Sequence, residues 1–356
     1  MPPIGPDNAT ADLVIAPVPA IAGFGAGIPE GSTRSALSFG QRVRAHLSIA
    51  RLDHSTKNVF VIPGILVALL ASRSAVDVNQ TVWNVVLALV ACTLIACSNY
   101  VINELLDAPY DRLHPIKKNR PCALGLVQPR AAVAQWISMM VAGLAVAALV
   151  SSYLFWTCAA LWIMGCLYNI PPVRTKDLTY VDVLSEAVNN PLRMLVGWYA
   201  VTHVVVPPIS LLASYWMFGA YFMALKRFSE YREIGDPARA TAYRRSFRYY
   251  TEQSLLVSVM FYASTGMLFF GAFIARYRLE LILAFPFIAM VAAVYMMLSF
   301  EQNSPVQHPE DLYKRPEISI PCAICAIVLA VLTFVDLPRL HEVLSPSIFQ
   351  SNVSGR

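Results

Sequence analysis

Residues 103–121 read N-E-L-L-D-A-P-Y-D-R-L-H-P-I-K-K-N-R-P, a polar stretch within an otherwise apolar sequence. Asn103, Asp107 and Asp111 are spaced four residues apart, so on a helix they share one face. Pro109 disfavours helical geometry at the residue before it, so we expect the helix to unwind near Asp107 and Asp111 to lie on a loop. The stretch therefore places two carboxylates and an amide at the end of an apolar helix.

Cationic or ionisable side chains follow these carboxylates: Arg112, His114, Lys117, Lys118 and Arg120. Clustered carboxylates bind a hard cation such as Mg²⁺, which takes further ligands from substrate phosphates. Cations beside them neutralise the remaining phosphate charge. A carboxylate at a membrane edge is a functional candidate by default, so we predict a magnesium and phosphate site here. A solvated loop with incidental charges is the alternative.

The composition is that of a polytopic membrane protein. Of the 356 residues, 57% are hydrophobic and 14% are charged, and the mean hydropathy is +0.54. The net charge of +5 does not indicate nucleic-acid binding, because the basic residues follow membrane topology. The seven cysteines lie mostly in apolar runs, where a free thiol packs as a small hydrophobe, so we expect no redox or zinc site at Cys322-x-x-Cys325.

The sequence predicts an all-α fold with nine transmembrane helices. Apolar runs of suitable length alternate with polar loops, although the first and fourth are short for a full span. The predicted segments are 58–72, 82–102, 131–152, 154–170, 181–203, 207–225, 253–275, 279–300 and 318–336.

The loops predict the orientation and the domain organisation. Most of the 27 Lys and Arg residues lie before the first segment or after the even-numbered ones, so the N-terminus and the long polar loops are expected in the cytoplasm. Residues 1–37 read as a disordered tail, 38–340 as one transmembrane catalytic domain, and 341–356 as a C-terminal tail. Within that domain, 38–51 has the pattern of an amphipathic helix lying on the membrane surface.

The fifth segment carries a polar face within hydrocarbon. Asp182, Glu186, Asn189, Asn190 and Arg193 recur at helical spacing and would form one stripe. Such a stripe faces a cavity or polar partners, because exposing it to lipid is costly. An internal structural network is the alternative to a substrate site.

Further polar groups fall on the same predicted membrane face. Lys226, Arg227 and Glu230 end the sixth segment, where capping of the helix is an alternative explanation for the cations. The basic and aromatic residues after them, including Arg244, read as membrane anchors. Lys57, Tyr168, Arg174 and Lys176 belong to the same face. A cytoplasmic cavity lined in this way suits a phosphorylated lipid and a polar or amphiphilic partner.

On these residues the chain resembles the UbiA-type intramembrane prenyltransferase superfamily. The resemblance rests on Asn103-x-x-x-Asp107-x-x-x-Asp111 and on the turn from Tyr168 through Pro171-Pro172-x-Arg174-x-Lys176. It covers about residues 40 to 336. It implies nine transmembrane helices around a central cavity that opens to the cytoplasmic side.

Within the superfamily the chain is most similar to the decaprenyl-phosphate phosphoribosyltransferase branch. Ordinary members carry a second acidic motif after helix six, whereas this chain has Lys226-Arg227-x-x-Glu230 there. Glu104 departs mildly from the branch, which commonly has Asp beside the motif Asn. The other marks are Asp111-Arg-x-His114-Pro-x-Lys117-x-x-Arg120-Pro, Lys57-Asn58, Lys176 with Asp182 and Arg193, and Pro309-Glu310-Asp311.

The resemblance implies that a 5-phosphoribosyl group moves from 5-phosphoribosyl diphosphate (PRPP) to a polyprenyl phosphate, with release of diphosphate. It also implies an integral protein of a bacterial plasma membrane acting in cell-envelope biosynthesis. Asn103, Asp107 and Asp111 would hold Mg²⁺, and Lys117 and Arg120 would neutralise the leaving diphosphate. The expected substrate and phosphate ligands are Lys57, Tyr168, Lys176, Asp182, Arg193, Lys226, Arg227 and Glu230.

Two other functions remain open at this stage. One is prenyl transfer from a polyprenyl diphosphate to an aromatic or other acceptor. The other is a transporter or lipid-binding protein whose polar stripe lines a passage, although no internal repeat typical of many transporters is visible.

Overall fold

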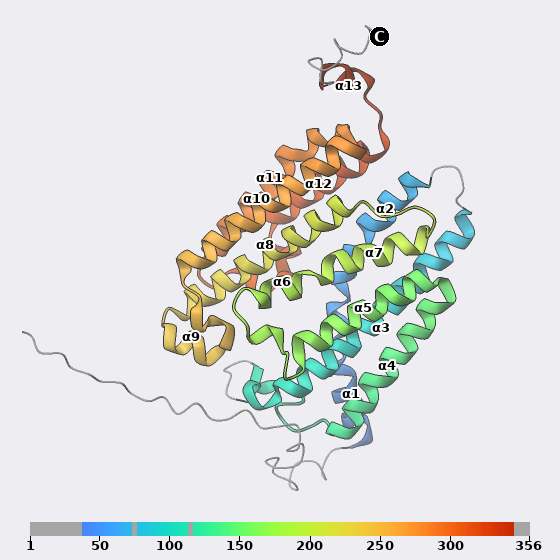
Figure 1. Ribbon diagram of the computed structural model, residues 1–356. Helices are drawn as coiled ribbons and strands as arrows, with labels where there is room; N and C mark the ends of the chain where they lie inside the picture. Colours follow the sequence, from blue (N-terminus) through green and yellow to red (C-terminus); the bar gives the residue numbers. More distant parts are fainter. Residues whose placement is uncertain (1–37, 73–76, 113–116, 345–356) are drawn as a thin grey trace, which may run out of the picture.

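A computed structural model describes residues 38–72, 77–112 and 117–344 (Figure 1). The regular secondary structure of these residues is all helical, and loops connect the helices. The predicted tail 1–37, His114 and most of the predicted C-terminal tail lie outside the described residues. The helices of the first half run from a short amphipathic helix to two consecutive helices separated by one residue. They are α1 (Phe39–Ile49), the 3₁₀ helix η2 (Leu52–Val61), α2 (Ile62–Ala71), α3 (Val78–Asp111), η3 (Lys117–Asn119), α4 (Pro129–Val150), α5 (Ser152–Asn169), η4 (Thr175–Asp177), α6 (Val181–Ala187) and α7 (Asn189–Val201).

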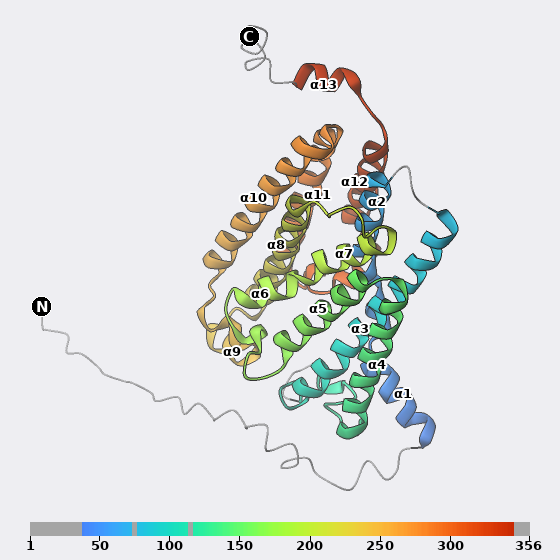
Figure 2. The same ribbon diagram turned by 45° about the vertical axis from the view of Figure 1, so that its right-hand side comes forward.

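The second half begins with α8, a helix of 26 residues. At one end of the molecule lie α9 and the end of α3, whereas α13 lies at the opposite end in both views (Figures 1 and 2). The helices are α8 (Ile209–Ile234), α9 (Pro237–Tyr243), η5 (Arg245–Tyr249), α10 (Glu252–Tyr277), η6 (Leu279–Ala284), α11 (Phe285–Ser299), η7 (Pro305–Gln307), η8 (Pro309–Lys314), α12 (Pro316–Phe334) and α13 (Pro338–Leu344).

Each of the nine predicted segments is helical in the structure. Among the described residues, five helices are long and apolar enough to cross a membrane by length and composition. A shorter apolar helix covers Lys57–Ala71. The five are Val78–Asp111, Pro129–Val150, Glu252–Tyr277, Leu279–Ser299 and Pro316–Phe334.

The helix that carries the acidic motif is longer than expected. The prediction that it unwinds near Asp107 is wrong, because α3 continues through Pro109 and ends at Asp111. Contacts with the rest of the molecule hold this last turn: Ala108 packs in a buried cluster, and Asp111 is buried beside Arg120. At 34 residues, α3 is about 50 Å long and exceeds a hydrocarbon core of about 30 Å, so its end reaches the membrane edge.

The fifth predicted segment is two helices, so its polar residues do not form one continuous stripe. Helix α6 ends at Ala187, and α7 begins at Asn189. Pro191 has no backbone N–H to donate to the carbonyl four residues earlier, at Ala187, which explains a break at this point. Asp182 of α6 pairs with Arg227 of α8, whereas Arg193 of α7 contacts Cys92 of α3.

Two glycines let α2 and α7 cross with their backbones in contact. A Cβ placed on Gly64 would collide with the carbonyl oxygen of Met194, and one placed on Gly197 would collide with that of Val61. The obstructing atoms belong to the backbone, so no side-chain rotation relieves the clash. This crossing fixes the start of α7, and with it Arg193, against the N-terminal half of the bundle.

Helix α1 forms where the amphipathic helix was predicted. Its Ala45 and Ile49 are buried in the bundle, whereas Phe39, Val43 and Leu47 are exposed at helical spacing. An exposed apolar row of this kind has the composition of an interfacial helix. Its contact with a membrane surface stays a prediction.

We expect Gly64→Val and Gly197→Val to destabilise the protein, because overpacking of a tight contact costs about 1–3 kcal/mol and a backbone clash costs more. Gly271→Val is the matched control, since a Cβ there has open space within 4 Å. Thermal unfolding of the detergent-purified variants measures the effect. Equal melting temperatures for Gly64→Val and Gly271→Val would contradict a close-packed crossing.

Candidate active site

The loop between α5 and α6 returns to the end of α3 and carries a lysine into the acidic motif. Arg174 adopts a left-handed conformation with φ of 31° immediately before η4, and this turns the chain back. Lys176, which is only 6% exposed, donates to the Oδ1 atoms of Asn103 and Asp107 at 2.9 and 2.7 Å. It also donates to Oδ1 of Asn169 at 2.9 Å.

A second cation shares the Asp107 carboxylate. Arg174 Nη2 lies 2.9 Å from Asp107 Oδ1, and its Nε lies 3.0 Å from Asp177 Oδ2. Arg245 of η5 approaches the same Asp177 carboxylate at 3.8 Å. These ion pairs connect the end of α3 to the loop after α5 and to the segment before α10.

Asp111 has a separate cationic partner. Arg120 Nη1 donates to Asp111 Oδ2 at 2.7 Å. Lys117 lies beside them with its ammonium 5.0 Å from the ring centre of Tyr243. Burial lowers the pKa of Lys117, and the nearby Glu230 acts in the opposite direction. The predicted residues Lys117 and Arg120 therefore lie beside one of the two motif carboxylates.

A buried network surrounds Asp182, which has no exposed surface. Its carboxylate accepts hydrogen bonds from Arg227 Nε at 3.1 Å and from the Tyr250 hydroxyl at 2.9 Å. Ser246 donates to the same group at 3.1 Å. Arg227 also donates to Glu230 at 2.9 Å. Helices α6 and α8 and the segment before α10 thus meet at one carboxylate.

Arg244 joins this network to the rest of the site, although the sequence pattern predicts a membrane anchor there. Its Nε lies 3.4 Å from Asp182 Oδ2, and its Nη2 donates to the Tyr168 hydroxyl at 3.1 Å. The Tyr168 ring centre in turn lies 6.0 Å from Lys176 Nζ. The interpretation of Arg244 as a membrane anchor is wrong because tertiary contacts, invisible in a run of basic residues, turn it inward.

The remaining predicted residues lie around this network or deeper in the bundle. Lys57 Nζ is 5.8 Å from the ring centre of Tyr100, one turn before Asn103 on α3. Lys226 is partly buried beside Arg227 on α8. Arg193 is 7% exposed and contacts Cys92, which stands eleven residues before Asn103. That interval corresponds to about 16 Å along α3, so Arg193 is not part of the ion-paired cluster.

The electrostatics of Lys176 follow from its enclosure. Burial lowers the pKa of Lys176 to about 8, although the Asp107 carboxylate acts in the opposite direction and favours the charged form. The ammonium is therefore held by three oxygen acceptors against the cost of removing it from water.

The three oxygen atoms around the Lys176 ammonium would also suit a hard divalent cation as ligands. One carboxylate oxygen and two amide oxygens converge on a single cationic nitrogen at 2.7–2.9 Å, and such oxygens are ligands of Mg²⁺. Within the described residues, no group of three or more His, Cys, Asp and Glu side chains is arranged to hold a metal. A metal here would therefore depend on amide oxygens and on substrate phosphates for further ligands.

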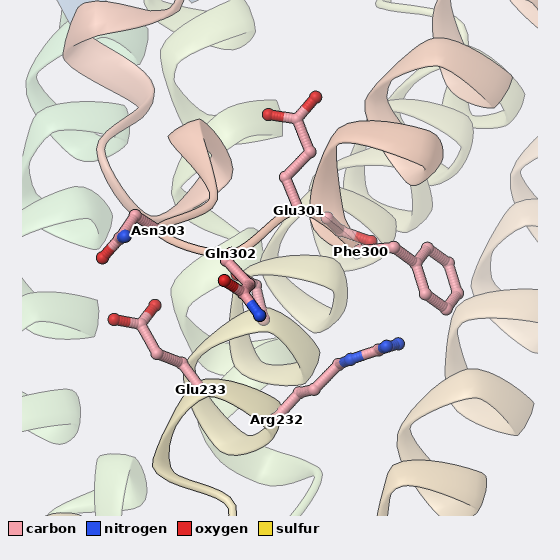
Figure 3. Close-up of a pocket in the computed structure, with 8 residues that line it drawn as sticks. Arg232, Glu233, Phe300, Glu301, Gln302 and Asn303 are labelled. Carbon is pink, nitrogen blue, oxygen red and sulfur yellow. The ribbon is translucent and has the colours of Figure 1, made fainter.

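A polar pocket of about 440 Å³ lies away from this cluster, between α8 and the turn after α11 (Figure 3). Arg232 and Glu233 line it from α8, and Phe300 and Glu301 line it from the other side. Glu233 already accepts a hydrogen bond from Gln307, and Glu301 is paired with Arg315. The acidic site itself is filled by its own ion-paired side chains.

Residues 60–313 match the UbiA prenyltransferase family. The chain belongs to this family. It is therefore a membrane transferase built on the UbiA fold, which removes the support for a transporter. The matched residues include the acidic motif, the loop that carries Lys176 and the whole Asp182 network.

A similar curated relative is a decaprenyl-phosphate phosphoribosyltransferase of Mycolicibacterium smegmatis, strain ATCC 700084 / mc(2)155. It is 30% identical over 205 residues, which cover 56% of this chain and 60% of the relative. The match thus spans less than two thirds of the relative's length.

Solved structures share the fold. A UbiA homologue from Archaeoglobus fulgidus, bound to DMAPP and Mg²⁺, superposes with a TM-score of 0.60 at 20% identity, covering 83% of this chain and all of that one. A homologue from Aeropyrum pernix K1 gives a TM-score of 0.56 at 16% identity, covering 79% and 98%. A digeranylgeranylglyceryl phosphate synthase gives 0.53 at 14%, covering 82% and 96%.

We expect Asp182→Asn to destabilise the protein strongly, because Arg244 loses its carboxylate partner and Arg227 keeps only Glu230. Breaking a buried ion pair from one side costs about 3–5 kcal/mol. The melting temperature of the purified protein measures the loss. Asp311→Asn is the control, since it breaks an exposed pair with Lys314 and should leave the melting temperature unchanged. If both variants melted with the wild type, the Asp182 network would not stabilise the fold.

Proposed function

We propose that the chain transfers a 5-phosphoribosyl group from PRPP to a polyprenyl phosphate of the decaprenyl-phosphate type, and releases diphosphate in a Mg²⁺-dependent reaction. An oxygen of the lipid phosphate forms the new bond to the anomeric carbon of ribose, and the bond from that carbon to the diphosphate breaks. The name of the curated relative, which is aligned over part of its length, agrees with this proposal.

The observation that carries the proposal is the excess of cations over carboxylates in the connected site. A reaction between two phosphorylated substrates brings more negative charge than a reaction of one prenyl diphosphate with an uncharged acceptor. Arginine and lysine side chains are the ligands that neutralise phosphate groups. The cations are Lys117, Arg120, Arg174, Lys176, Lys226, Arg227, Arg244 and Arg245, and the carboxylates are Glu104, Asp107, Asp111, Asp177, Asp182 and Glu230.

On the donor side, we assign Asn103, Asp107 and Asp111 to holding the metal ion against the diphosphate. When bound, Mg²⁺ supplies positive charge that stabilises the leaving group. Lys117 and Arg120 lie beside Asp111, so they are suited to neutralise the diphosphate as the anomeric bond breaks. Stabilisation of developing charge is usually the largest catalytic contribution.

The other cations are assigned to the ribose 5-phosphate and the lipid phosphate. Lys57, Lys176, Lys226 and Arg227 provide this charge near the end of α3, and Arg193 provides it deeper in the bundle. Tyr168 orients Arg244 through its hydroxyl. Because its oxygens already accept hydrogen bonds from buried donors, we assign Asp182 to orienting Arg227 and Arg244.

The lipid phosphate is already anionic, so the transfer needs no general base. We infer that α2, α5, the pair α6–α7 and α8 complete nine spans together with the five long apolar helices. The prenyl chain would lie among these spans, in a central cavity that opens at the acidic end. The excess of basic residues at that end supports a cytoplasmic orientation. The proposal also places the chain in a bacterial plasma membrane, with a role in cell-envelope biosynthesis.

A second candidate is prenyl transfer from a polyprenyl diphosphate to an aromatic or other acceptor. It is favoured by the fold neighbour whose structure holds DMAPP and Mg²⁺. Both reactions would use the same magnesium and diphosphate ligands. They differ in which substrate loses its diphosphate.

We expect radiolabel from PRPP to enter the organic phase when the purified chain is incubated with Mg²⁺ and a panel of polyprenyl phosphates. EDTA should abolish this transfer, because the leaving diphosphate would lose its metal ion. A parallel reaction with a labelled polyprenyl diphosphate tests the second candidate. Release of diphosphate from the prenyl donor, with PRPP left intact, would overturn the phosphoribosyl assignment.

Asp107→Asn should lower the rate of transfer by about 100-fold or more, as expected when a principal electrostatic group is removed from a reaction centre. Asp336→Asn is the control, because Asp336 pairs with Arg278 through an exposed contact outside the cluster. Size-exclusion chromatography establishes that both variants remain folded. Undiminished turnover in folded Asp107→Asn would remove Asp107 from the metal site.

A further inference from the structure

The Lys176 ammonium is enclosed as a metal ion would be. Its three donors match three oxygen acceptors, which are Oδ1 of Asn103, Asp107 and Asn169, at 2.9, 2.7 and 2.9 Å. The acceptors come from α3 and from the last residue of α5. Asn169 is 4% exposed and is additionally fixed by a hydrogen bond from its amide nitrogen to the Gly165 carbonyl. We refer to these three oxygens as the oxygen cradle.

The oxygen cradle has room for one cation, and both an ammonium group and a divalent metal ion suit it. Carboxylate and amide oxygens are ligands for Mg²⁺ as well as acceptors for an ammonium group. A divalent ion and the ammonium cannot share the same three oxygens, because like charges at such a separation repel strongly in a medium of low dielectric constant. Entry of a metal ion therefore requires Lys176 to leave.

We propose that Lys176 is a tethered substitute for the metal ion. It fills the oxygen cradle in the metal-free protein, and it moves onto the diphosphate of the donor when the metal and the donor bind. Asn169 then becomes a fourth protein oxygen ligand, in addition to Asn103, Asp107 and Asp111 assigned from the acidic motif. This inference rests on the magnesium and diphosphate site of the proposed function, but not on which group is transferred.

The surroundings of Lys176 allow such a movement. Lysine carries its charge on a flexible four-carbon stem, so rotation of the side chain moves the ammonium without moving the backbone. The loop before η4 is held outside the cradle by the pair between Arg174 and Asp177. The second contact of Arg174 is with Asp107 Oδ1, an oxygen of the cradle. The Tyr168 ring, with its centre 6.0 Å from Nζ, offers a second surface to the displaced charge.

Displacement makes binding of the metal depend on diphosphate. Without diphosphate, the metal must expel a buried cation that then has no anionic partner. With diphosphate, the displaced Lys176 gains phosphate oxygens as acceptors, so metal and diphosphate bind cooperatively. By linkage, each ligand raises the affinity for the other by the same factor.

The test measures binding of Mn²⁺ to the full chain in detergent, without PRPP or lipid, by the loss of the electron paramagnetic resonance signal of free Mn²⁺. We expect Lys176→Met to bind Mn²⁺ about tenfold more tightly than the wild type, within the range of ordinary coupling energies. Lys118→Met, which removes an exposed charge from the neighbouring loop, should bind as the wild type does. Lys176→Met should also bind labelled pyrophosphate with Mg²⁺ more weakly, because the displaced lysine is missing.

A neutral substitution separates displacement from a simple change in charge. Asn169→Leu in the Lys176→Met background should reverse the gain in Mn²⁺ affinity, since it removes one oxygen of the cradle without changing the charge. Mn²⁺ affinity of folded Lys176→Met no greater than that of the wild type would overturn the proposal, and so would an unchanged affinity after Asn169→Leu. Neither readout uses the transfer reaction, so a failure of phosphoribosyl transfer leaves this result standing. If Asp107→Asn failed to weaken Mn²⁺ binding, the metal site of the proposed function would fail instead.

Discussion

The ion pair between Lys176 and Asp107 joins two parts of the chain on which the rest of the site depends. It attaches the loop after α5 to the last turns of α3 at 2.7 Å. Asp182 lies six residues later, in the first turn of the next helix. Its carboxylate pairs with Arg227 from α8 and with Arg244 from the segment before α10. The contact at Lys176 therefore sets where the polar side chains of four helical regions meet.

Burial of so many charges imposes a strict pairing. In a protein interior of low dielectric constant, a charge without a partner costs several kcal/mol. Each motif carboxylate accordingly has a cation of its own: Asp107 has Lys176 and Arg174, and Asp111 has Arg120. Each motif carboxylate of the resting site is thus paired, and the same cations form the set from which phosphate oxygens would be bound.

This pairing explains in physical terms how an apolar helix bundle would accept highly charged substrates. Phosphate groups would replace the carboxylates as partners of cations that are already desolvated and oriented. The free-energy cost of burying those cations has then already been met by folding. A metal ion would take over the carboxylates released in the exchange. The same arrangement suits a chain of the UbiA family with a buried arginine, Arg227, near the end of α8.

Part of this site could be predicted from the amino-acid sequence. Every segment predicted from the apolar runs is helical here, because hydrophobic length is a local property of the chain. The four-residue spacing of Asn103, Asp107 and Asp111 likewise indicated one helical face. The course of α3 through Pro109 was not predictable, because packing of Ala108 and pairing of Asp111 outweigh the local preference of a proline.

The linear chain was sufficient for the class of the protein, the helical segments and the chemical character of the site, since these follow from composition and short-range spacing. The partner of each charge depended on the tertiary structure. Arg244 turns inward to Asp182 and Tyr168, and Asn169 turns toward Lys176, through contacts between residues distant in sequence or across a reversed turn. No local pattern encodes such contacts, because a buried charge selects its partner from whatever the packed helices bring within hydrogen-bonding distance.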